Sequence, residues 1–165
     1  MKKQVNNLVS LALLWSLIAC ESDTSHKITA KRGAISSVDD DGLRGSAADF
    51  IANAGDRVFF DFDRSNISSD ANATLRRQGD WLRKNSGLNV QIEGHCDERG
   101  TREYNIALGH RRAEAAGSRL KNCGVPSSRI NTISYGKDRP IAVQGNQSEV
   151  YRMNRVAISV LDKVS

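Results

Sequence analysis

Residues 92–113 read IEGHCDERGTREYNIALGHRRA, and this segment decides the fold. It begins with the end of a predicted strand, because Val90 and Ile92 alternate with polar neighbours as in a half-buried strand. Gly94 predicts the turn that closes this strand. The polar loop 97–102 follows and leads into a helix.

The helix after this loop has start and stop signals of its own. Thr101 has the side chain of an N-cap, and the pattern predicts a helix over residues 102–122. Gly124 and then Pro126 supply the stop. The segment thus predicts a strand, a loop and a helix in succession.

One of two adjacent arginines on this helix should point inward. On a wheel of about 100° per residue, Arg112 lies in the middle of the predicted buried face and Arg111 at its edge. A guanidinium keeps its charge and is costly to bury unpaired, so Arg112 requires an anion. That anion is either a protein carboxylate, with Asp97 nearest, or one that a ligand brings. The residues that mark the face are Tyr104, Leu108, Ala115, Ala116 and Leu120.

Strands and helices alternate in the rest of the chain. In a predicted strand at 58–63, Val58, Phe60 and Phe62 share one face. The order β-α-β-α-β-β predicts an α/β fold, a two-layer sandwich with helices on one face of a mixed sheet. The other predicted elements are a short helix at 47–54, a helix at 70–84 capped by Ser68 or Ser69, and strands at 130–135 and 155–161.

Three segments resemble the OmpA-like peptidoglycan-binding domain, and within that family the peptidoglycan-associated lipoproteins. They are GHCDERGTREYNIALGHRRA at 94–113, RINTISYGKDRP at 129–140 and NRVAISV at 154–160. The resemblance covers residues 55–161 and implies the same OmpA-like fold. Two residues depart from the family pattern: Cys96 replaces a common threonine, and Val156 stands where a second arginine often follows Arg155.

The resemblance also implies a binding site for peptidoglycan. The residues that match Asp97 and Arg112 hold the zwitterionic end of meso-diaminopimelate in the stem peptide, so the arginine would clamp a carboxylate and the aspartate would accept from an ammonium. Phe62 is otherwise a core residue, and Asn105 is otherwise a structural tie within the loop. Further positions of the same groove match Phe62, Asp63, Arg99, Asn105 and Leu108.

The N-terminal part of the chain predicts a processed lipoprotein. A basic start and a short apolar run predict a signal peptide over residues 1–19. The tetrapeptide LIAC resembles a bacterial lipobox, which implies that its last residue, Cys20, carries acyl chains that hold outer-membrane lipid. Residues 20–49 then form the lipidated N-terminus and a polar linker, and residues 50–165 form the peptidoglycan-binding domain.

Composition and motif spacing argue against other classes of function. The formal net charge of +5 is modest and no nucleic-acid motif accompanies it, so we do not expect nucleic-acid binding. No CxxC or HxxxH spacing indicates a zinc site, and no cofactor is expected. Cys96 and Cys123 lie at opposite ends of the predicted helix, so we expect two free thiols.

The His95-Cys96 dipeptide raises one enzymatic alternative, an L,D-transpeptidase. Neighbouring strand residues point to opposite faces of a sheet, and no second histidine is placed to act as a base. We therefore expect no enzymatic activity.

The resulting hypothesis is a non-enzymatic anchor. Cys20 would hold the outer membrane, and the domain, facing the periplasm, would bind diaminopimelate-type peptidoglycan without a covalent bond. The resemblance further implies a place in the Tol-Pal system in envelope constriction during cell division, with TolB and other Tol proteins as partners. The alternative is another OmpA-like envelope lipoprotein that binds peptidoglycan but not TolB.

Overall fold

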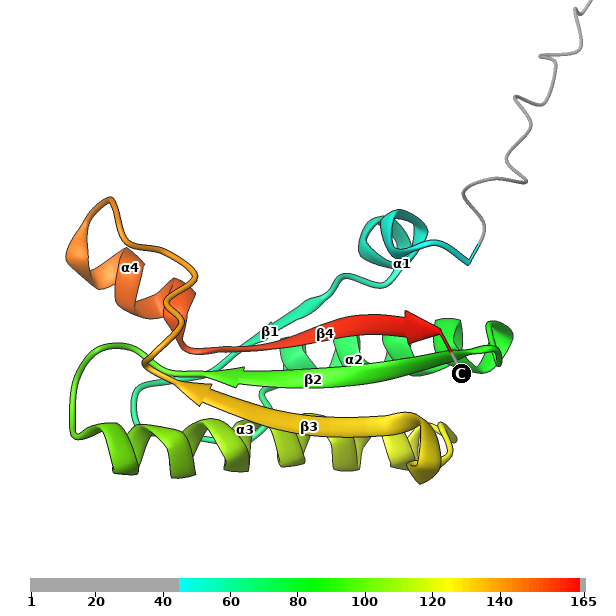
Figure 1. Ribbon diagram of the computed structural model, residues 1–165. Helices are drawn as coiled ribbons and strands as arrows, with labels where there is room; N and C mark the ends of the chain where they lie inside the picture. Colours follow the sequence, from blue (N-terminus) through cyan, green and yellow to red (C-terminus); the bar gives the residue numbers. More distant parts are fainter. Residues whose placement is uncertain (1–44, 164–165) are drawn as a thin grey trace, which may run out of the picture. The chain divides into compact units, whose positions relative to one another are not determined.

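The computed structural model describes residues 45–163 (Figure 1). The predicted signal peptide, Cys20 and most of the predicted linker lie outside these residues. Among these residues, each helix is too short or too polar to span a bilayer. The elements in chain order are α1 (Ala47–Asn53), β1 (Arg57–Phe59), α2 (Ser69–Lys84), β2 (Leu88–His95), α3 (Arg102–Asn122), the 3₁₀ helix η2 (Ser127–Arg129), β3 (Ile130–Gly136), α4 (Gln147–Asn154) and β4 (Val156–Lys163).

The strands form one mixed sheet in the order β1-β4-β2-β3. β4 is antiparallel to both of its neighbours, whereas β2 and β3 run parallel. The two long helices, α2 and α3, pack on the sheet and on each other (Figure 1). The predicted fold class, an α/β domain with a mixed sheet covered by helices, is confirmed.

The core lies between the sheet and the two long helices. Val90 and Ile92 of β2, Leu75 and Leu82 of α2, and Leu120 of α3 are all fully buried. Each such side chain contributes about 1.5–3 kcal/mol relative to an exposed one. The sequence predicts Leu75 and Leu82 or Trp81 on the inward side of α2, which is confirmed, and the sheet has one apolar face that the helices cover.

α3 approaches β2 closely because two glycines meet. A Cβ atom on Gly94 would lie 1.9 Å from the carbonyl oxygen of Gly109, and one on Gly109 would lie 2.3 Å from Oγ of Ser134. The expectation that Gly94 closes the strand is wrong, since β2 continues to His95. The contact with α3 is what requires glycine here, and it brings the start of α3 near the end of β2.

The bounds of α3 agree with the prediction, but its buried face is rotated. Thr101 caps the helix by accepting from the N–H of Tyr104, and Arg112 is fully buried while Arg111 is exposed. Tyr104, expected inside, is 45% exposed, and Ala115 is only partly buried. The helix instead turns its smallest residues inward, and these are Gly109, Ala113, Ala116 and Gly117.

Near the sheet edge one expectation is wrong and one element was not predicted. β1 ends at Phe59, so Phe62 lies in the following loop and is 57% exposed rather than part of the core. The connection before β4 contains a helix, α4, that the pattern did not predict; its cap is Asn146, which accepts from the N–H of Ser148. Figure 1 shows α4 at the end of the sheet where β2 ends and β4 begins.

Candidate functional site

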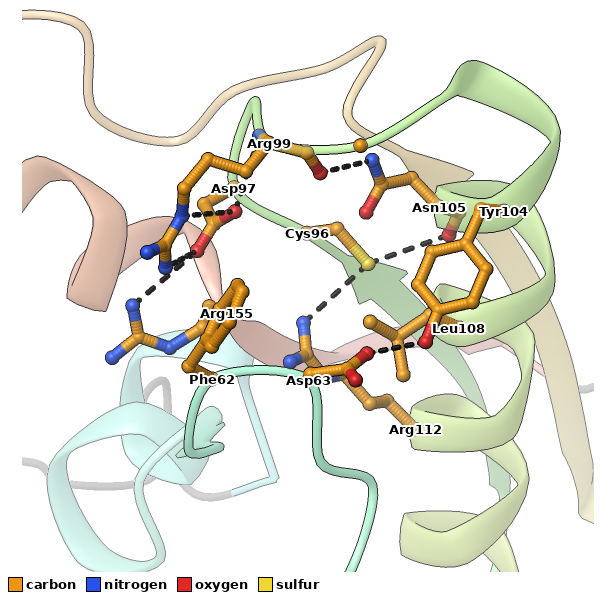
Figure 2. A pocket seen from close by; sticks show the side chains of 11 residues that line it. Phe62, Asp63, Cys96, Asp97, Arg99, Tyr104, Asn105, Leu108, Arg112 and Arg155 are labelled. Atoms are coloured by element: carbon orange, nitrogen blue, oxygen red, sulfur yellow. Dashed lines mark hydrogen bonds and ion pairs between the residues drawn. The ribbon is translucent and has the colours of Figure 1, made fainter.

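Four segments converge at this end of the sheet and enclose a pocket of about 180 Å³ (Figure 2). They are the loop after β1, the loop between β2 and α3, α3 from its start to its middle, and the residue before β4. Their lining residues are Phe62, Asp63, Cys96, Asp97, Arg99, Gly100, Tyr104, Asn105, Leu108, Arg112 and Arg155.

The structure brings all seven residues of the predicted groove to this one pocket, although they come from three separate segments. The groove prediction did not include the remaining four lining residues. Tyr104 was assigned to the core by the helical wheel. Arg155 could have been found from the sequence, since it lies inside NRVAISV, one of the three segments that resemble the family.

Arg112 is fully buried, and its partners are main-chain carbonyls rather than a carboxylate. Its Nε donates to the carbonyl oxygen of Arg64 over 2.8 Å, Nη1 to that of His95 over 2.8 Å, and Nη2 to that of Asp61 over 3.1 Å. Nη1 also lies 3.4 Å from Sγ of Cys96. The interpretation of Arg112 and Asp97 as a structural ion pair is therefore wrong.

The ion pairs formed among residues 45–163 do not include Arg112. Burial lowers the pKa of Arg112, but a guanidinium stays charged at any ordinary pH. Carbonyl oxygens satisfy its N–H groups without cancelling its charge. Arg112 is thus a positive charge at the pocket wall that lacks a carboxylate counter-ion within the described residues.

Asp97 is the matching negative charge, and its side chain is 5% exposed. Arg99 donates to it from Nη2 over 2.6 Å and from Nε over 3.3 Å, and Nη1 of Arg155 lies 3.4 Å away. Burial raises the pKa of Asp97, but the hydrogen bonds from Arg99 and then Arg155 outweigh burial, and the pKa falls below its ordinary value. Asp97 is therefore ionised at neutral pH.

Arg99 lies across the mouth of the pocket between two aromatic rings. Its guanidinium carbon is 3.8 Å from the ring centre of Phe62 and 4.6 Å from that of Tyr151. Cation–π contacts of this kind contribute about 0.5–1 kcal/mol at exposed sites, and Phe62 lines the pocket from this position. Phe62 therefore forms part of the pocket wall, and its interpretation as a core residue is wrong.

The opposite wall joins the loop after β1 to α3. The hydroxyl of Tyr104 donates to Oδ1 of Asp63, and this bond raises the pKa of Tyr104. Asp63 has a positive φ of 56°, an uncommon conformation that aspartate tolerates better than most residues. The contact bridges the two segments at the edge of the pocket.

Asn105 ties the loop between β2 and α3 to the helix, as one of its two interpretations proposed. Its Nδ2 donates to the carbonyl oxygens of Arg99 over 2.8 Å and Thr101 over 3.1 Å. Its own carbonyl oxygen accepts from Sγ of Cys96 over 3.3 Å. Asn105 thus shapes the loop that carries Asp97, while Leu108 adds a buried apolar surface to the pocket.

His95 and Cys96 are adjacent in the chain but bind to different groups. Nδ1 of His95 lies 3.0 Å from the carbonyl oxygen of Arg139, and burial lowers the pKa of its imidazole. Cys96 bonds to Asn105 instead, and burial raises the pKa of its thiol. A thiol nucleophile requires a base within hydrogen-bond reach, and this arrangement does not provide His95 as one. Both Cys96 and Cys123 are free, as predicted.

Comparison with known proteins assigns this domain to a family. The OmpA family is matched by residues 59–154, more than half of the chain. A protein of Brucella melitensis biotype 1, the peptidoglycan-associated lipoprotein, is 42% identical over 154 residues, which are 93% of this chain and 91% of that protein. The chain belongs to the peptidoglycan-associated lipoproteins of the OmpA family.

Two further peptidoglycan-associated lipoproteins extend the comparison. That of Rhizobium meliloti is 54% identical over 117 residues, 71% of this chain and 66% of that protein, so the match spans just under two thirds of the relative. The crystal structure of that from Burkholderia pseudomallei has a TM-score of 0.61 at 34% identity and covers 65% of this chain and 90% of that chain. Within this peptidoglycan-associated lipoprotein, the matched OmpA region contains every pocket residue except Arg155, which follows its end directly.

Proposed function

We propose that this protein binds the diaminopimelate-containing stem peptide of peptidoglycan in the pocket described above, without forming a covalent bond. One observation carries the proposal: a single pocket holds a buried guanidinium, Arg112, that lacks a carboxylate partner among residues 45–163, together with a buried ionised carboxylate, Asp97. A ligand that presents a carboxylate and an ammonium on one carbon matches both charges.

The free end of meso-diaminopimelate has this chemistry. Its carboxylate would accept from Arg112 and its ammonium would donate to Asp97, which are both charge-assisted hydrogen bonds. The methylene chain behind them would contact Phe62 and Leu108. A pocket of about 180 Å³ is smaller than the roughly 300–1,000 Å³ of drug-binding pockets, so it suits the end of one residue rather than a whole peptide.

The proposal extends to the place of the protein in the cell. Acyl chains on Cys20 would hold the outer membrane, the domain would face the periplasm, and the two together would tether the membrane to the cell wall. Similar proteins bear the name peptidoglycan-associated lipoprotein, which supports both halves of this proposal.

The partner proteins are a separate part of the proposal. We propose that the protein works with TolB and other Tol proteins in envelope constriction during cell division. A pulldown with purified TolB tests this part on its own: capture supports the Tol-Pal assignment. If TolB is not captured while peptidoglycan is bound, another envelope lipoprotein with an OmpA domain is the better description.

Cosedimentation with purified sacculi tests the ligand. The chain without residues 1–20 is mixed with sacculi that contain diaminopimelate and, in parallel, with sacculi that contain lysine at the same position. Lysine keeps the ammonium but lacks the second carboxylate, so we expect binding to the first kind and weak binding to the second.

Variants of the protein test the site. Asp97→Ala and Arg112→Ala each remove one charge-assisted contact of about 1.5–3 kcal/mol, enough to take a micromolar binder out of the pellet. Arg111→Ala is the matched control, because Arg111 is the exposed neighbour on the same helix. Circular dichroism and urea unfolding verify that each variant is folded. If the folded variants sediment as wild type does, the ligand does not occupy this pocket; if wild type stays in solution, the peptidoglycan assignment is wrong.

A further inference from the structure

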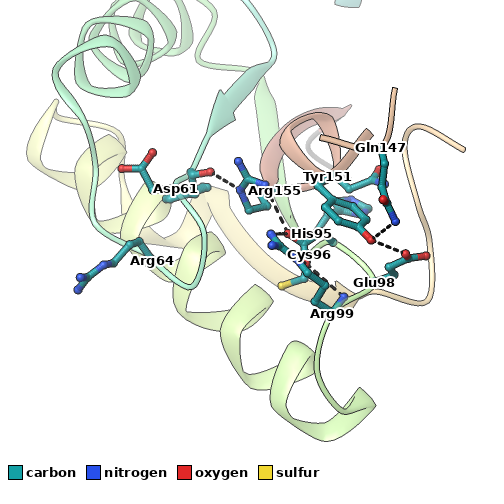
Figure 3. A network of polar contacts seen from close by, with 12 residues as sticks. Asp61, Arg64, His95, Cys96, Glu98, Arg99, Gln147, Tyr151 and Arg155 are labelled. Carbon is teal, nitrogen blue, oxygen red and sulfur yellow. Dashed lines mark hydrogen bonds and ion pairs between the residues drawn. The ribbon is translucent and has the colours of Figure 1, made fainter. Parts of the chain in front are cut away.

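We propose that Arg155 is a positioning residue of the pocket. It holds the Asp97 carboxylate in place while the ammonium of the ligand replaces Arg99 at the carboxylate oxygen atoms. This inference rests on the proposed function, since it assigns a role in binding to a residue outside the predicted groove. Figure 2 shows Asp97 with Arg99 and Arg155, and Figure 3 shows Arg99 and Arg155 beside Tyr151, Glu98 and Gln147.

The two arginines reach Asp97 from different settings. Arg99 makes the closer contact, 2.6 Å to Oδ2, but its side chain is 39% exposed. Arg155 lies 3.4 Å from the same oxygen, and its side chain is 14% exposed. A ligand that enters from solvent meets Arg99 first, whereas Arg155 lies deeper and is better shielded from exchange with solvent.

Arg155 is also fixed by the sheet. Its Nε donates to the carbonyl oxygen of Phe60 over 2.9 Å, and the N–H of Phe60 donates to the carbonyl oxygen of Arg155 over 2.9 Å. The main-chain bond from Phe60 continues the ladder between β1 and β4 beyond the last paired strand residues, Phe59 and Val156, and the Nε bond returns to the same residue. The guanidinium therefore has little freedom to leave Asp97.

Arg99 has a second set of contacts that do not involve Asp97. Its guanidinium lies between the rings of Phe62 and Tyr151, at 3.8 Å and 4.6 Å. The hydroxyl of Tyr151 is itself fixed, because it donates to Oε1 of Glu98 over 2.7 Å and accepts from Nε2 of Gln147 over 2.6 Å. Arg99 can thus release the carboxylate and stay at the mouth of the pocket, which leaves Arg155 as the permanent cation beside Asp97.

The test compares Arg155→Gln and Arg155→Lys with wild type in the chain without residues 1–20. Calorimetry measures the affinity for a soluble stem peptide that contains diaminopimelate, from about pH 3 to about pH 8. Arg152→Gln is the matched control, because Arg152 lies three residues earlier, on α4, and its guanidinium lies over Phe59 rather than beside Asp97. NMR titration of the Asp97 carboxyl in the ligand-free variants supplies a readout that does not depend on binding.

We expect Arg155→Gln to weaken binding at neutral pH about ten-fold or more, as loss of a charged hydrogen-bond partner does. Because a lost cation raises the pKa of the carboxyl, the acidic limb of the binding profile and the Asp97 titration should both move to higher pH. Arg155→Lys should recover part of each effect, and Arg152→Gln should change neither.

Two results overturn the inference. If Arg155→Gln is folded and keeps both the affinity and the acidic limb of wild type, Arg155 does not act through Asp97. If its affinity falls while the Asp97 titration stays in place, the loss has a purely structural cause. If wild type does not bind the peptide, the proposed function itself is refuted. Results with the Arg155 variants alone cannot refute it.

Discussion

Nη1 of Arg112 donates to the carbonyl oxygen of His95 over 2.8 Å, which joins the middle of α3 to the last residue of β2. Bonds from the same guanidinium to the carbonyl oxygens of Asp61 and Arg64 add the loop after β1. The charge proposed to bind the ligand therefore also organises three of the segments that line the pocket. A variant at this position tests folding and binding together, so the two must be measured separately.

Arg112→Ala should lower the free energy of unfolding by about 2–4 kcal/mol, because it leaves buried carbonyl oxygens without a donor. Arg111→Ala, on the exposed side of α3, should change it by less than about 0.5 kcal/mol. Urea unfolding followed by circular dichroism measures both. Equal stability of the two variants would show that the carbonyl bonds contribute nothing.

Gly94→Ala should destabilise the domain by about 3 kcal/mol or more, because the new methyl group would overlap the carbonyl group of Gly109 and force α3 away from β2. Gly87→Ala is the control, since no atom lies within 4 Å of a Cβ at that position. Thermal unfolding of both variants measures the difference. A Gly94→Ala variant as stable as Gly87→Ala would mean that the helix can shift without cost.

Asp97 should make the free energy of unfolding depend on pH in the acidic range. Its folded pKa is depressed, so its contribution is present above the unfolded value of about 3.9 and is lost as pH falls through the lower folded value. Wild type should exceed Asp97→Asn in unfolding free energy at about pH 6, and the gap should close as the pH is lowered. Urea unfolding across this range measures the gap, and a gap that is independent of pH would exclude Asp97 as its source.

Because His95 is buried, we expect the free energy of unfolding to depend on pH in a second, higher range as well. Burial lowers the pKa of its imidazole in the folded state, so the unfolded chain takes up a proton first as the pH falls below about 6.5. Stability should therefore decrease as the pH falls from about 6.5 toward the folded value. His95→Gln should flatten this slope, measured by urea unfolding across the range. Equal slopes in the variant and in wild type would contradict the assignment.

The two thiols of the domain should differ in reactivity. Cys96 is 2% exposed and burial raises the pKa of its thiol, so little reactive thiolate is present, whereas Cys123 is partly exposed. The test uses two variants of the chain without residues 1–20, each with one thiol left: Cys123→Ser keeps Cys96, and Cys96→Thr keeps Cys123. An aromatic disulfide reagent should modify Cys96 at least about ten-fold more slowly than Cys123. Similar rates would show that the pocket opens readily.

The long elements could be predicted from sequence because each has a strong local signal. α3 has a threonine cap, and α2 has a serine cap and the inward leucines Leu75 and Leu82. α4 could not be recognised, because its short sequence lacks an apolar stripe and its only buried residue is Asn154. Phe62 shows the limit of period-two patterns, since alternation continued past the point where β1 loses its partner strand.

The site was predicted as a set of residues but not as a set of contacts. The wheel placed Arg112 inside, and the resemblance supplied the other groove positions. Neither could show that main-chain carbonyls would satisfy Arg112, since main-chain groups leave no mark on the sequence. The pairing of Asp97 with Arg155 was equally hidden, because it joins residues that are 58 positions apart.

If the protein is anchored as proposed, the short strand β1 lies on the path along which mechanical load reaches the pocket. It pairs with β4 through only three residues at the edge of the sheet, and the loop with Phe62 and Asp63 follows almost at once. Tension from a membrane tether at the N-terminal side would reach α1 first, where Phe50 is buried against Trp81, and would then pass into this strand. The three-residue ladder of β1 thus lies between the tether and the loop that lines the pocket, so load on the membrane would reach the wall-binding site through this strand.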